Sequence, residues 1–444
     1  MEYRYRDASE MKDSGVEWIG KIPTDWKCKK LKYVAYCEDG KRIPLSSVER
    51  GKRKGNIPYW GANSIIDYVD DFLIDYEVVL IGEDGAPFFD KIKPVAFYSN
   101  EKIWPNNHVH ILKPINEMNA KFLVNSLNIV DYKNYIKGST RDKLTQFDMS
   151  NIIIQIPNNK DEQEKIVNFL DKKTSQFDSI ISKKEALIEK LEEAKKSLIS
   201  EVVTGKVKVV KTDDGYDLVK RSSDEMKDSG VEWLGKIPKD WLYIPLKYLA
   251  NITGGYAFSS NEFRDDGIQI IKIANLYNNK LSLDRQPSFV GFDYLDSHKD
   301  FIVTKGDILI SLTGTLGKRD YGYSIVLDDD RKFLLNQRVG KIKYKSNVNL
   351  KYGIYLLQNE SYLTSLYSLP TGTKQANLSN EQVLSIKIPL PNINEQEILA
   401  EYLDLKVDLI ESNIYKIKYQ IEKLKEAKQS LISEAVTGKI EILD

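Results

Sequence analysis

The chain carries one stretch of sequence twice. MKDSGVEWIGKIPTDW at residues 11–26 returns as MKDSGVEWLGKIPKDW at residues 226–241. A second repeat pairs EEAKKSLISEVVTGKVKV at 192–209 with KEAKQSLISEAVTGKIEI at 425–442. Such self-similarity indicates one structural unit built twice, which constrains the fold more than any local pattern does. The chain is therefore organised as a variable block, a shared block, a second variable block and the shared block again.

The two variable blocks match each other weakly, but in the same order. VVLIGEDG at 78–85 and DILISLTG at 307–314 are both apolar, strand-like runs that end in a glycine turn. GSTRDKLT at 138–145 parallels GTKQANLS at 372–379, and each leads into a strand that ends in Pro157 or Pro389. Matches that keep one order predict two domains of one fold whose surfaces have diverged.

A narrow apolar stripe runs through each shared block. Its members follow steps of four and three residues, which is typical of a helix that buries one stripe against another helix. They are Phe177, Ile181, Ile188, Leu191 and Leu198 in the first block and Ile410, Ile414, Ile417, Ile421, Leu424 and Leu431 in the second. Each helix could instead pack on its own domain, but two equivalent stripes favour pairing with each other. Antiparallel pairing would place the variable domains at opposite ends of a rod.

The predicted fold class is α+β. It comprises two related, mixed α/β domains separated by two long helices that pair as an antiparallel coiled coil, with a pseudo-twofold internal repeat. The predicted boundaries are 1–160 for the first variable domain, 161–210 for the central long helix and linker, 211–392 for the second variable domain and 393–444 for the C-terminal long helix. A chain of 444 residues is long enough for several domains.

Composition and motifs exclude several classes of protein. Basic and acidic residues balance at 65 each, so any binding to nucleic acid must come from local basic patches. Cys28 and Cys37 are too few for a disulfide framework, and a metal site at His108 and His110 would lack further ligands, so no metal is expected. No apolar run is long enough to span a membrane, and no signal-peptide pattern is present, which predicts a cytoplasmic protein. The sequence contains no phosphate-binding loop or adenine-methylation motif, which predicts that this chain does no catalysis.

Taken together, the motifs resemble the specificity subunit of type I restriction-modification systems over nearly the whole chain. The resemblance is carried by SGVEWxGKIPxDW before each variable block, by EQE at 162–164 and 395–397, and by SLISExVTGK at 197–206 and 430–439. It implies that each variable block is a target recognition domain that reads one half of a bipartite DNA sequence. Because the blocks differ in length, the two half-sites should be unrelated and the target asymmetric.

The same resemblance implies which partners and cofactors are involved. The long helices would set the spacer between half-sites and dock two modification (methyltransferase) subunits for adenine methylation. Restriction subunits would join through them to give an ATP-dependent endonuclease and translocase. S-adenosylmethionine, ATP and Mg would then belong to the partner subunits, and this chain would bind double-stranded DNA and hold no cofactor.

Candidate DNA contacts in the first block lie in polar loops. The basic run VERGKRKGN could contact phosphates or could be an ordinary solvated loop. Asn63 could pair with adenine, or it could cap a turn beside a core made by Tyr59 and Trp60. The predicted contacts are Lys41, Arg42, Arg53, Lys54, Trp60, Asn63, Asn107, Thr140, Arg141 and Lys143.

The second block offers a comparable set. Its glycine-flanked loops allow close approach of the backbone, and LNQRV at 335–339 concentrates base-reading side chains. Strand alternation there should expose Gln337 and bury its neighbours. The predicted contacts are Tyr256, Ser259, Arg264, Thr313, Thr315, Lys318, Arg319, Gln337, Arg338, Lys374 and Gln375.

One alternative belongs to a different class of protein, a two-headed coiled-coil scaffold with no role on DNA. A protein-binding head should expose aromatic and apolar anchors, whereas these loops are rich in Arg, Lys, Asn and Gln. The repeated tryptophans, Trp18, Trp26, Trp233 and Trp241, are predicted to be packing anchors. Two domains with different targets would not share the residues that read them.

Overall fold

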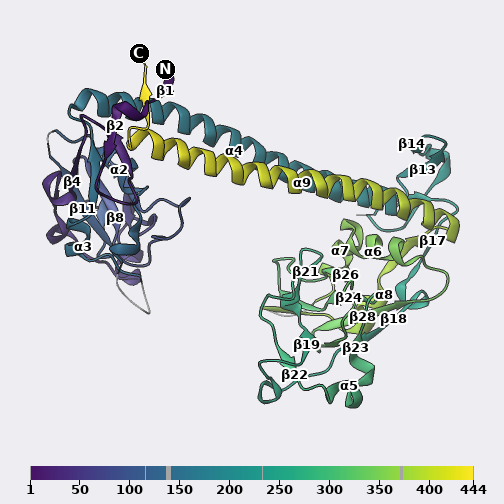
Figure 1. Cartoon of the computed structure of the whole chain (residues 1–444). Coiled ribbons are helices and arrows are strands. Elements are labelled where there is room, and N and C mark those ends of the chain that lie inside the picture. Colours follow the sequence, from purple (N-terminus) through teal and green to yellow (C-terminus); the bar gives the residue numbers. More distant parts are fainter. Residues whose placement is uncertain (1, 116, 137–141, 233, 371–373, 444) are drawn as a thin grey trace. The chain divides into compact units, whose positions relative to one another are not determined.

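The computed structural model describes residues 2–115, 117–136, 142–232, 234–370 and 374–443. Contacts divide it into two compact units, Met1–Ala186 with Lys416–Asp444, and Leu187–Tyr415. Each unit combines a strand-rich part with portions of both long helices (Figure 1). The division therefore cuts through the helical segments, and the domain boundaries expected from the sequence stay a prediction.

The first unit is built on a four-stranded antiparallel sheet in the order β5-β11-β8-β9. All of β8 is buried, because its sequence VVLIG is apolar and pairs with a strand on each side. A second, three-stranded sheet has the order β10-β6-β7, with β10 parallel to β6. The strands are β5 Ala35–Cys37, β6 Lys54–Trp60, β7 Ile65–Val69, β8 Val78–Gly82, β9 Ala96–Ser99, β10 Trp104–Pro105 and β11 Val109–Pro114.

Smaller elements join this sheet to the helices. The repeated stretch at 11–26 forms the hairpin β2·β3, and the strand after it pairs with the strand that leads into the long helix. The elements are β1 Tyr3–Tyr5, β2 Met11–Asp13, β3 Lys21–Pro23, β4 Lys27–Lys30, β12 Ile153–Ile156, α1 Ser47–Lys52, α2 Ala120–Leu127 and α3 Gln146–Ser150.

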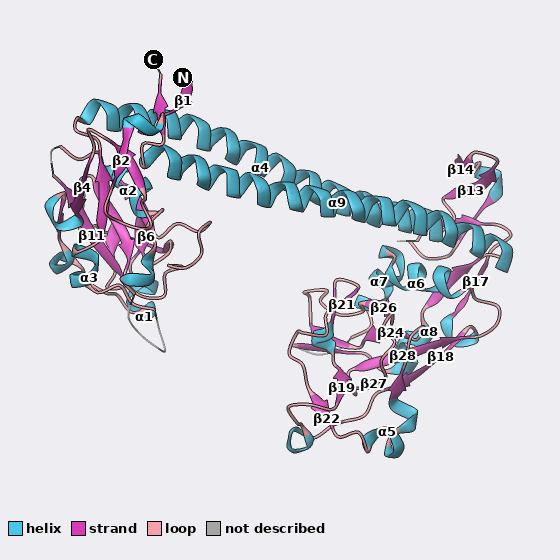
Figure 2. Cartoon of the chain, viewed as in Figure 1, coloured by secondary structure: helices cyan, strands magenta, loops and turns pink. Residues whose placement is uncertain are grey.

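The second unit repeats this plan. Its antiparallel sheet has the order β18-β28-β24-β26, and β27 runs parallel to β19 as β10 does to β6. The shared strands are β15 Met226–Asp228, β16 Lys236–Pro238, β17 Leu242–Pro245, β18 Ala250–Gly254, β19 Ile268–Ile271, β24 Ile308–Ser311, β26 Ser324–Val326, β27 Phe333–Leu335, β28 Val339–Tyr344 and β30 Lys387–Leu390. Two related, mixed α/β domains were predicted, and this prediction is confirmed (Figure 2).

The second unit also has elements of its own around the common sheet. Strands β22 and β23 flank the β19·β27 pair, and β25 pairs with β29 beside the main sheet. The elements are β20 Leu276–Tyr277, β21 Lys280–Leu281, β22 Phe289–Val290, β23 Ile302–Val303, β25 Thr313–Thr315, β29 Gln375–Asn377, α5 Tyr294–Ser297, α6 Leu350–Gln358, α7 Glu360–Tyr367 and α8 Asn380–Ser385.

Two helices of 44 residues, α4 Lys160–Val203 and α9 Ile393–Val436, pack together with opposite directions. In the first unit Lys428 Nζ lies 2.6 Å from Asp178 Oδ1, and Lys184 Nζ donates to Gln420 Oε1 over 2.7 Å. In the second unit Lys195 Nζ lies 3.3 Å from Glu411 Oε1. The predicted antiparallel pairing is confirmed.

The apolar stripe expected from the sequence lies on the less exposed side of both helices. Three of its members, Ile181, Ile414 and Ile421, are buried. The others are half-buried, namely Phe177, Ile188, Leu191, Leu198, Ile410, Ile417, Leu424 and Leu431. Outward positions such as Tyr415 and Tyr419 are exposed.

The duplicated sequence forms a frame that ties each sheet to both helices. Trp26 is fully buried and donates from Nε1 to Glu162 at the start of α4 over 3.2 Å, as Trp241 does to Glu395 of α9 over 3.1 Å. A Cβ built on Gly438, just after α9, would lie 3.2 Å from Trp26, and one on Gly205, just after α4, would lie 3.1 Å from Trp241. Each tryptophan therefore bridges the start of one long helix and the end of the other. Trp18 is half-buried, and Trp233 lies outside the described residues.

A small two-stranded sheet occurs at equivalent places in the two units. In the second unit it is the hairpin of β13 Val207–Thr212 and β14 Gly215–Lys220. In the first unit β1 pairs with β31 Ile440–Ile442, so the two ends of the chain make the same element without a covalent turn. Among the described residues, no helix is both long enough and apolar enough to cross a membrane.

Candidate nucleic-acid interface

Four loops of the first unit meet at one end of its main sheet. The loop after β8 is central: Glu83 N–H donates to His108 O over 2.9 Å, and Leu144 N–H donates to Glu83 O over 2.7 Å. Asn63 joins it by donating from Nδ2 to Gly85 O over 2.9 Å. Hydrogen bonds thus hold together the loops that carry the predicted contacts Asn63, Asn107 and Lys143.

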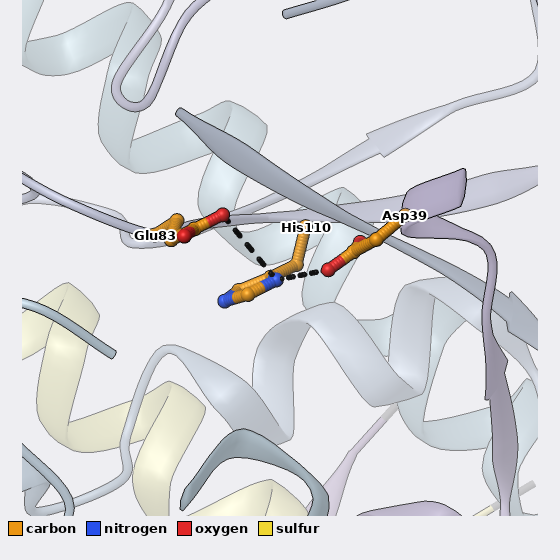
Figure 3. A group of neighbouring side chains, drawn as sticks. All are labelled: Asp39, Glu83 and His110. Atoms are coloured by element: carbon orange, nitrogen blue, oxygen red, sulfur yellow. Dashed lines mark hydrogen bonds and ion pairs between the residues drawn. The ribbon is translucent and has the colours of Figure 1, made fainter. Parts of the chain in front are cut away.

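A charged network lies beneath these loops and is formed by Asp39, Arg42, Glu83, His110 and Lys143. Figure 3 draws three of its members, Asp39, Glu83 and His110. Arg42 Nη1 is 2.5 Å from Glu83 Oε2, and Lys143 Nζ is 3.1 Å from Glu83 Oε1. His110 is buried, with Nδ1 2.6 Å from Asp39 Oδ2 and Nε2 2.8 Å from Leu144 O. Arg42 and Lys143 are therefore bound to this network, although the sequence suggested them as DNA contacts.

The two carboxyl groups of the network are ionised. Burial by itself raises the pKa of Asp39, but the hydrogen bond and charge of His110, the Ile111 N–H and the charge of Arg42 hold it below its ordinary value. Burial likewise raises the pKa of Glu83, and the hydrogen bonds of Arg42 and Lys143 lower it by more. Both groups thus carry negative charge that lies against fixed positive charge.

His110 does have neighbouring residues that can act as metal ligands, contrary to expectation. The histidines were expected to lack neighbouring metal ligands, whereas Asp39, Glu83 and His110 offer ligand atoms within 4.8 Å of one another. The sequence could not bring them together, because they lie on three separate segments. Arg42, Lys143 and the Leu144 carbonyl already bond to these ligand atoms, so the group is a closed ionic network, and no metal site is assigned to it.

The basic run of the first unit is paired within the unit. The segment forms α1 and the start of β6 rather than a loop. Arg53 Nε lies 2.9 Å from Asp70 Oδ1, and Lys54 Nζ lies 2.8 Å from Asp67 Oδ1. Asp67 also binds Arg50 at 3.2 Å. Neighbouring aspartates therefore offset much of the charge that the sequence assigned to phosphates.

The remaining first-block candidates differ in accessibility. Lys41 is exposed, although it bonds to Tyr76 and pairs with Glu38 at 3.0 Å. Trp60 is half-buried and packs on Phe97 with ring centroids 5.4 Å apart. Asn107 is exposed. The other two candidates, Thr140 and Arg141, lie outside the described residues.

At the equivalent end of the second unit, backbone hydrogen bonds between two short strands hold the loops together. Strand β25 pairs with β29, which puts Thr315 opposite Gln375, while Thr313 is buried and donates to Asn377 over 3.1 Å. The turn after β25 exposes Lys318 and Arg319, and Arg319 pairs with Glu360 at 3.0 Å. Lys374 and Gln375 are exposed. This end therefore presents Thr315, Lys318, Arg319, Lys374 and Gln375 together, over paired strands.

The expected alternation at LNQRV is wrong for Arg338. Strand β27 ends at Leu335, and the three residues that follow form a turn into β28 rather than a strand. Gln337 is exposed as predicted, but Arg338 is exposed as well. Because a turn has no two-residue period, both side chains face solvent.

The glycine-initiated loop of the second unit separates into packed and exposed residues. Tyr256 packs on His298 and Phe258, with centroids 4.4 Å and 5.0 Å away. Ser259 is exposed, and its Oγ caps a short helical turn by accepting from Asn261 N–H. Arg264 is exposed. Of this loop, Ser259 and Arg264 are accessible, whereas Tyr256 is half-buried.

The two ends share one backbone plan with different side chains. Leu312 N–H donates to Arg338 O as Glu83 N–H donates to His108 O, each over 2.9 Å. Leu378 N–H donates to Leu312 O as Leu144 N–H donates to Glu83 O. Asp39 and Glu83 were missed by sequence reasoning because lone acidic residues are common. The alternation of NNHVHI, which buries His110, was the one available signal.

Comparisons with known proteins agree with this arrangement. The family model described as "Type I restriction modification DNA specificity domain" matches residues 23–193 and 238–423. The chain is 28% identical over 430 residues to the type I restriction enzyme MjaVIII specificity subunit of Methanocaldococcus jannaschii, covering 95% of this chain and 94% of that protein. It is 26% identical over 397 residues to a putative type I restriction enzyme specificity subunit, S.HindORF215P, of Haemophilus influenzae, covering 89% and 88%.

A solved structure shares the fold. It comes from work on complex assembly and conformational transition of the type I R-M system, and it superposes with a TM-score of 0.64 at 13% identity. The match covers 94% of this chain and 99% of that one. At this identity the similarity concerns the fold alone.

Proposed function

This chain belongs to the type I restriction modification DNA specificity family, and from that premise we propose that it is the DNA-reading subunit of a type I restriction-modification complex. Each strand-rich domain reads one half of an asymmetric, bipartite target. The chain itself does no catalysis, and adenine methylation or ATP-dependent cleavage belongs to partner subunits.

One observation carries this proposal. The two units keep the same sheet order and the same buried tryptophan frame, while the described loops at the equivalent ends of their sheets carry different sets of polar side chains. A common frame with divergent polar loops is what two readers of different sequences require. The scaffold alternative needs exposed apolar anchors as the main feature of those ends. The exposed predicted contacts there are polar, namely Lys, Arg, Asn, Gln and Ser side chains, although Ile66, Phe89 and Phe263 are also exposed close to them in the sequence.

Within this function we assign the recognition domains to 1–160 and 211–392 and the ruler helices to 161–210 and 393–444. The exposed side chains of Gln337, Arg338 and Gln375 are suited to base edges, because amide and guanidinium groups pair with two atoms of adenine or guanine. Lys318 and Lys374 are suited to phosphates, which attract a point charge without reading sequence.

Two modification subunits are the partners we propose for the long helices. Leu405, Leu409 and Tyr415 of α9 are large apolar residues left exposed on the face away from the apolar stripe. Such residues on a helix mark a surface that a partner covers. Restriction subunits would join through the modification subunits, and S-adenosylmethionine, ATP and Mg would bind to those partners.

The experiment is a genome-wide map of methylated adenines in cells that express the chain with its methyltransferase. The expected result is one asymmetric, bipartite motif, which is absent when the methyltransferase is expressed alone. Replacing residues 211–392 with the corresponding block of a relative should change one half-site and leave the other intact. Methylation without sequence preference, or a block exchange that changes both halves, contradicts the proposal.

A further inference from the structure

The turn between β10 and β11 of the first unit has a counterpart between β27 and β28 of the second unit. The two turns are NNHV at 106–109 and NQRV at 336–339, so their first and last residues are the same and their two central residues differ. In each turn the N–H of the asparagine donates to the last residue of the neighbouring parallel strand, β6 or β19, over 3.0 Å. The backbone of the turn is therefore fixed in the same way in both units, and only the central side chains change.

His108 occupies the third place of its turn, as Arg338 does in the second unit. The Asn106 side chain accepts the His108 N–H over 2.7 Å, and the Asn336 side chain accepts the Arg338 N–H over 3.4 Å. The carbonyls of His108 and Arg338 each accept an N–H over 2.9 Å from the residue that follows β8 or β24. Because both backbone groups have equivalent partners, the two side chains start from equivalent points among the loops.

The His108 side chain is accessible, and one of its ring nitrogens is already bound. Its exposed fraction is 41%, whereas His110, two residues later, is buried. Nδ1 lies 2.6 Å from Asp84 Oδ1, and no described residue bonds to Nε2. A ring nitrogen this close to a carboxylate oxygen carries the hydrogen of the pair, which leaves Nε2 as the ring nitrogen that can bond to DNA.

Asp84 is suited to hold the ring in this orientation. Its side chain is only 15% exposed, and its backbone forms a bridge to Lys143. A reading side chain that is already held in one rotamer loses less entropy when it binds. In the second unit the residue at the place of Asp84 is Thr313, which is buried and donates to Asn377 instead. The fold of the loop thus forms without a carboxylate at this place, and the carboxylate of the first unit has the histidine to orient.

We propose that His108 is a specificity-determining residue of the first recognition domain, and that its Nε2 bonds to a base edge in the first half-site as Arg338 does in the second. This inference rests on the proposed reading of DNA and adds a residue to it, since Asn107 was a predicted contact and His108 was not. Hydrogen bonds to base edges carry sequence information, whereas bonds to phosphates do not. One imidazole nitrogen bonds to one atom of a base edge, while a guanidinium can bond to two, so His108 discriminates less strongly than Arg338.

Maps of methylated adenines in cells that express each variant with the methyltransferase test this assignment. We expect His108→Ala to lose about tenfold of discrimination at one base pair of the first half-site and to keep the second half-site intact. Arg338→Ala is the matched control, which should relax one base pair of the second half-site only. His108→Arg introduces the side chain of the second unit, so guanine should become the preferred base at the position that His108→Ala relaxes.

Hydrogen exchange separates a reading residue from a residue that serves the fold. Amides of β8 and β11 should exchange equally in His108→Ala, His108→Arg and the wild-type chain. Relaxation at every position of the first half-site, together with faster exchange, would overturn the assignment, because the ring would then stabilise the domain. A wild-type motif that both variants leave unchanged would also overturn it, while the proposed function would stand. A wild-type map without any motif would overturn both.

Discussion

Single charged residues of the first unit are largely neutralised by neighbours in the same unit, and this limits what they can give to DNA. Asp67 is the clearest case, because it lies 2.8 Å from Lys54 and 3.2 Å from Arg50. Its carboxylate holds two of the cations that the sequence had suggested for phosphates. Removing that carboxylate should release them.

We predict that Asp67→Asn raises non-specific affinity for DNA and steepens its salt dependence, by about one unit of slope for each released cation. The control is Glu17→Gln, which makes the same change in net charge at an exposed site with no ion pair among the described residues. Binding of a random duplex measured across a salt series checks this. Equal slopes for the two variants would contradict it.

The Asp67 carboxyl also makes the stability of the folded chain depend on pH. The hydrogen bond from Lys54, the Tyr68 N–H and the hydrogen bond from Arg50 lower the pKa of Asp67 to about 2. Because the folded pKa lies below the unfolded one, the stabilisation is present above about pH 4 and is lost as pH falls toward about 2. A carboxyl titration of the full chain by NMR should find this pKa, and Lys54→Ala should raise it. An ordinary aspartate pKa in the wild-type chain would refute the pairing.

Two glycines of the first unit have the same backbone conformation but different surroundings. Gly438 has φ +70°, and a Cβ there would lie 2.5 Å from Pro23 Cδ. Gly15 has φ +74° and nothing within 4 Å. Gly438→Ala should lower the free energy of unfolding of the first unit by about 2–4 kcal/mol, and Gly15→Ala by about 1 kcal/mol, because only the former adds a clash to the left-handed backbone. Hydrogen exchange of β8 and β11 amides in the full chain measures the free energy of unfolding of both variants. If the two variants lose the same stability, the close approach to Pro23 does not contribute to the cost of Gly438→Ala.

At the residue scale, the sequence predicted which residues would be contact candidates better than whether their side chains are exposed, buried or paired. It singled out Gln337, which is exposed, but expected Arg338 to be buried because it treated a turn as a strand. It could not foresee that Asp39, Glu83 and His110 meet, since their segments are adjacent only in the folded sheet. Pairing between distant charges has no local sequence signal.

At the scale of elements, periodicity was informative where the elements are long. Long helices were expected within residues 161–210 and 393–444, and the structure has α4 beginning at Lys160 and α9 at Ile393. The buried run of β8 was also expected from VVLIG. Short strands such as β25 and β29 were not separable from loops, because they exist only through pairing with each other.

The apolar stripe of the long helices allows a prediction at this scale. Ile421 is buried on a turn of α9 that lies against α4, where Gln420 accepts from Lys184. Ile421→Ala should cost about 2–4 kcal/mol through the cavity it leaves, whereas Tyr419→Ala, at an exposed position, should stay within about 0.5 kcal/mol. Exchange of helix amides in the full chain measures both. A loss at Tyr419 as large as at Ile421 would mean that the stripe is not the pairing surface.

At the scale of the whole molecule, the internal repeat predicted the domain organisation, which neither variable block predicts by itself. Two copies of one sequence frame required two copies of one sheet, and the strand orders agree. How the copies share their helices was not predictable from the sequence. The frame of the first unit binds the start of α4 and the end of α9, and that of the second unit binds the end of α4 and the start of α9. Each unit is therefore completed by segments far apart in the chain.

Because each unit is completed by distant segments of the chain, the chain ends can be placed in either of the two small two-stranded sheets. The β1·β31 pair brings Leu443 N–H to Glu2 O over 2.9 Å, and its counterpart in the second unit is the continuous hairpin β13·β14. Joining residue 443 to residue 2 by a short turn, and opening the chain between Asp213 and Asp214, should exchange the roles of the two sheets without removing a buried contact.

We predict that this circular permutant folds and, with its methyltransferase, methylates the same sites as the parent chain. Asp213 and Asp214 are exposed in the hairpin turn, so new ends there leave both sheets paired. The matched control opens the chain between Leu80 and Ile81 of β8, where both residues are fully buried, and should yield no folded first unit. Methylome maps and amide exchange of both units test the pair of permutants. If opening the hairpin turn abolished folding as completely as opening β8 does, the prediction would be wrong. The chain would then need its ends at the β1·β31 pair in order to fold.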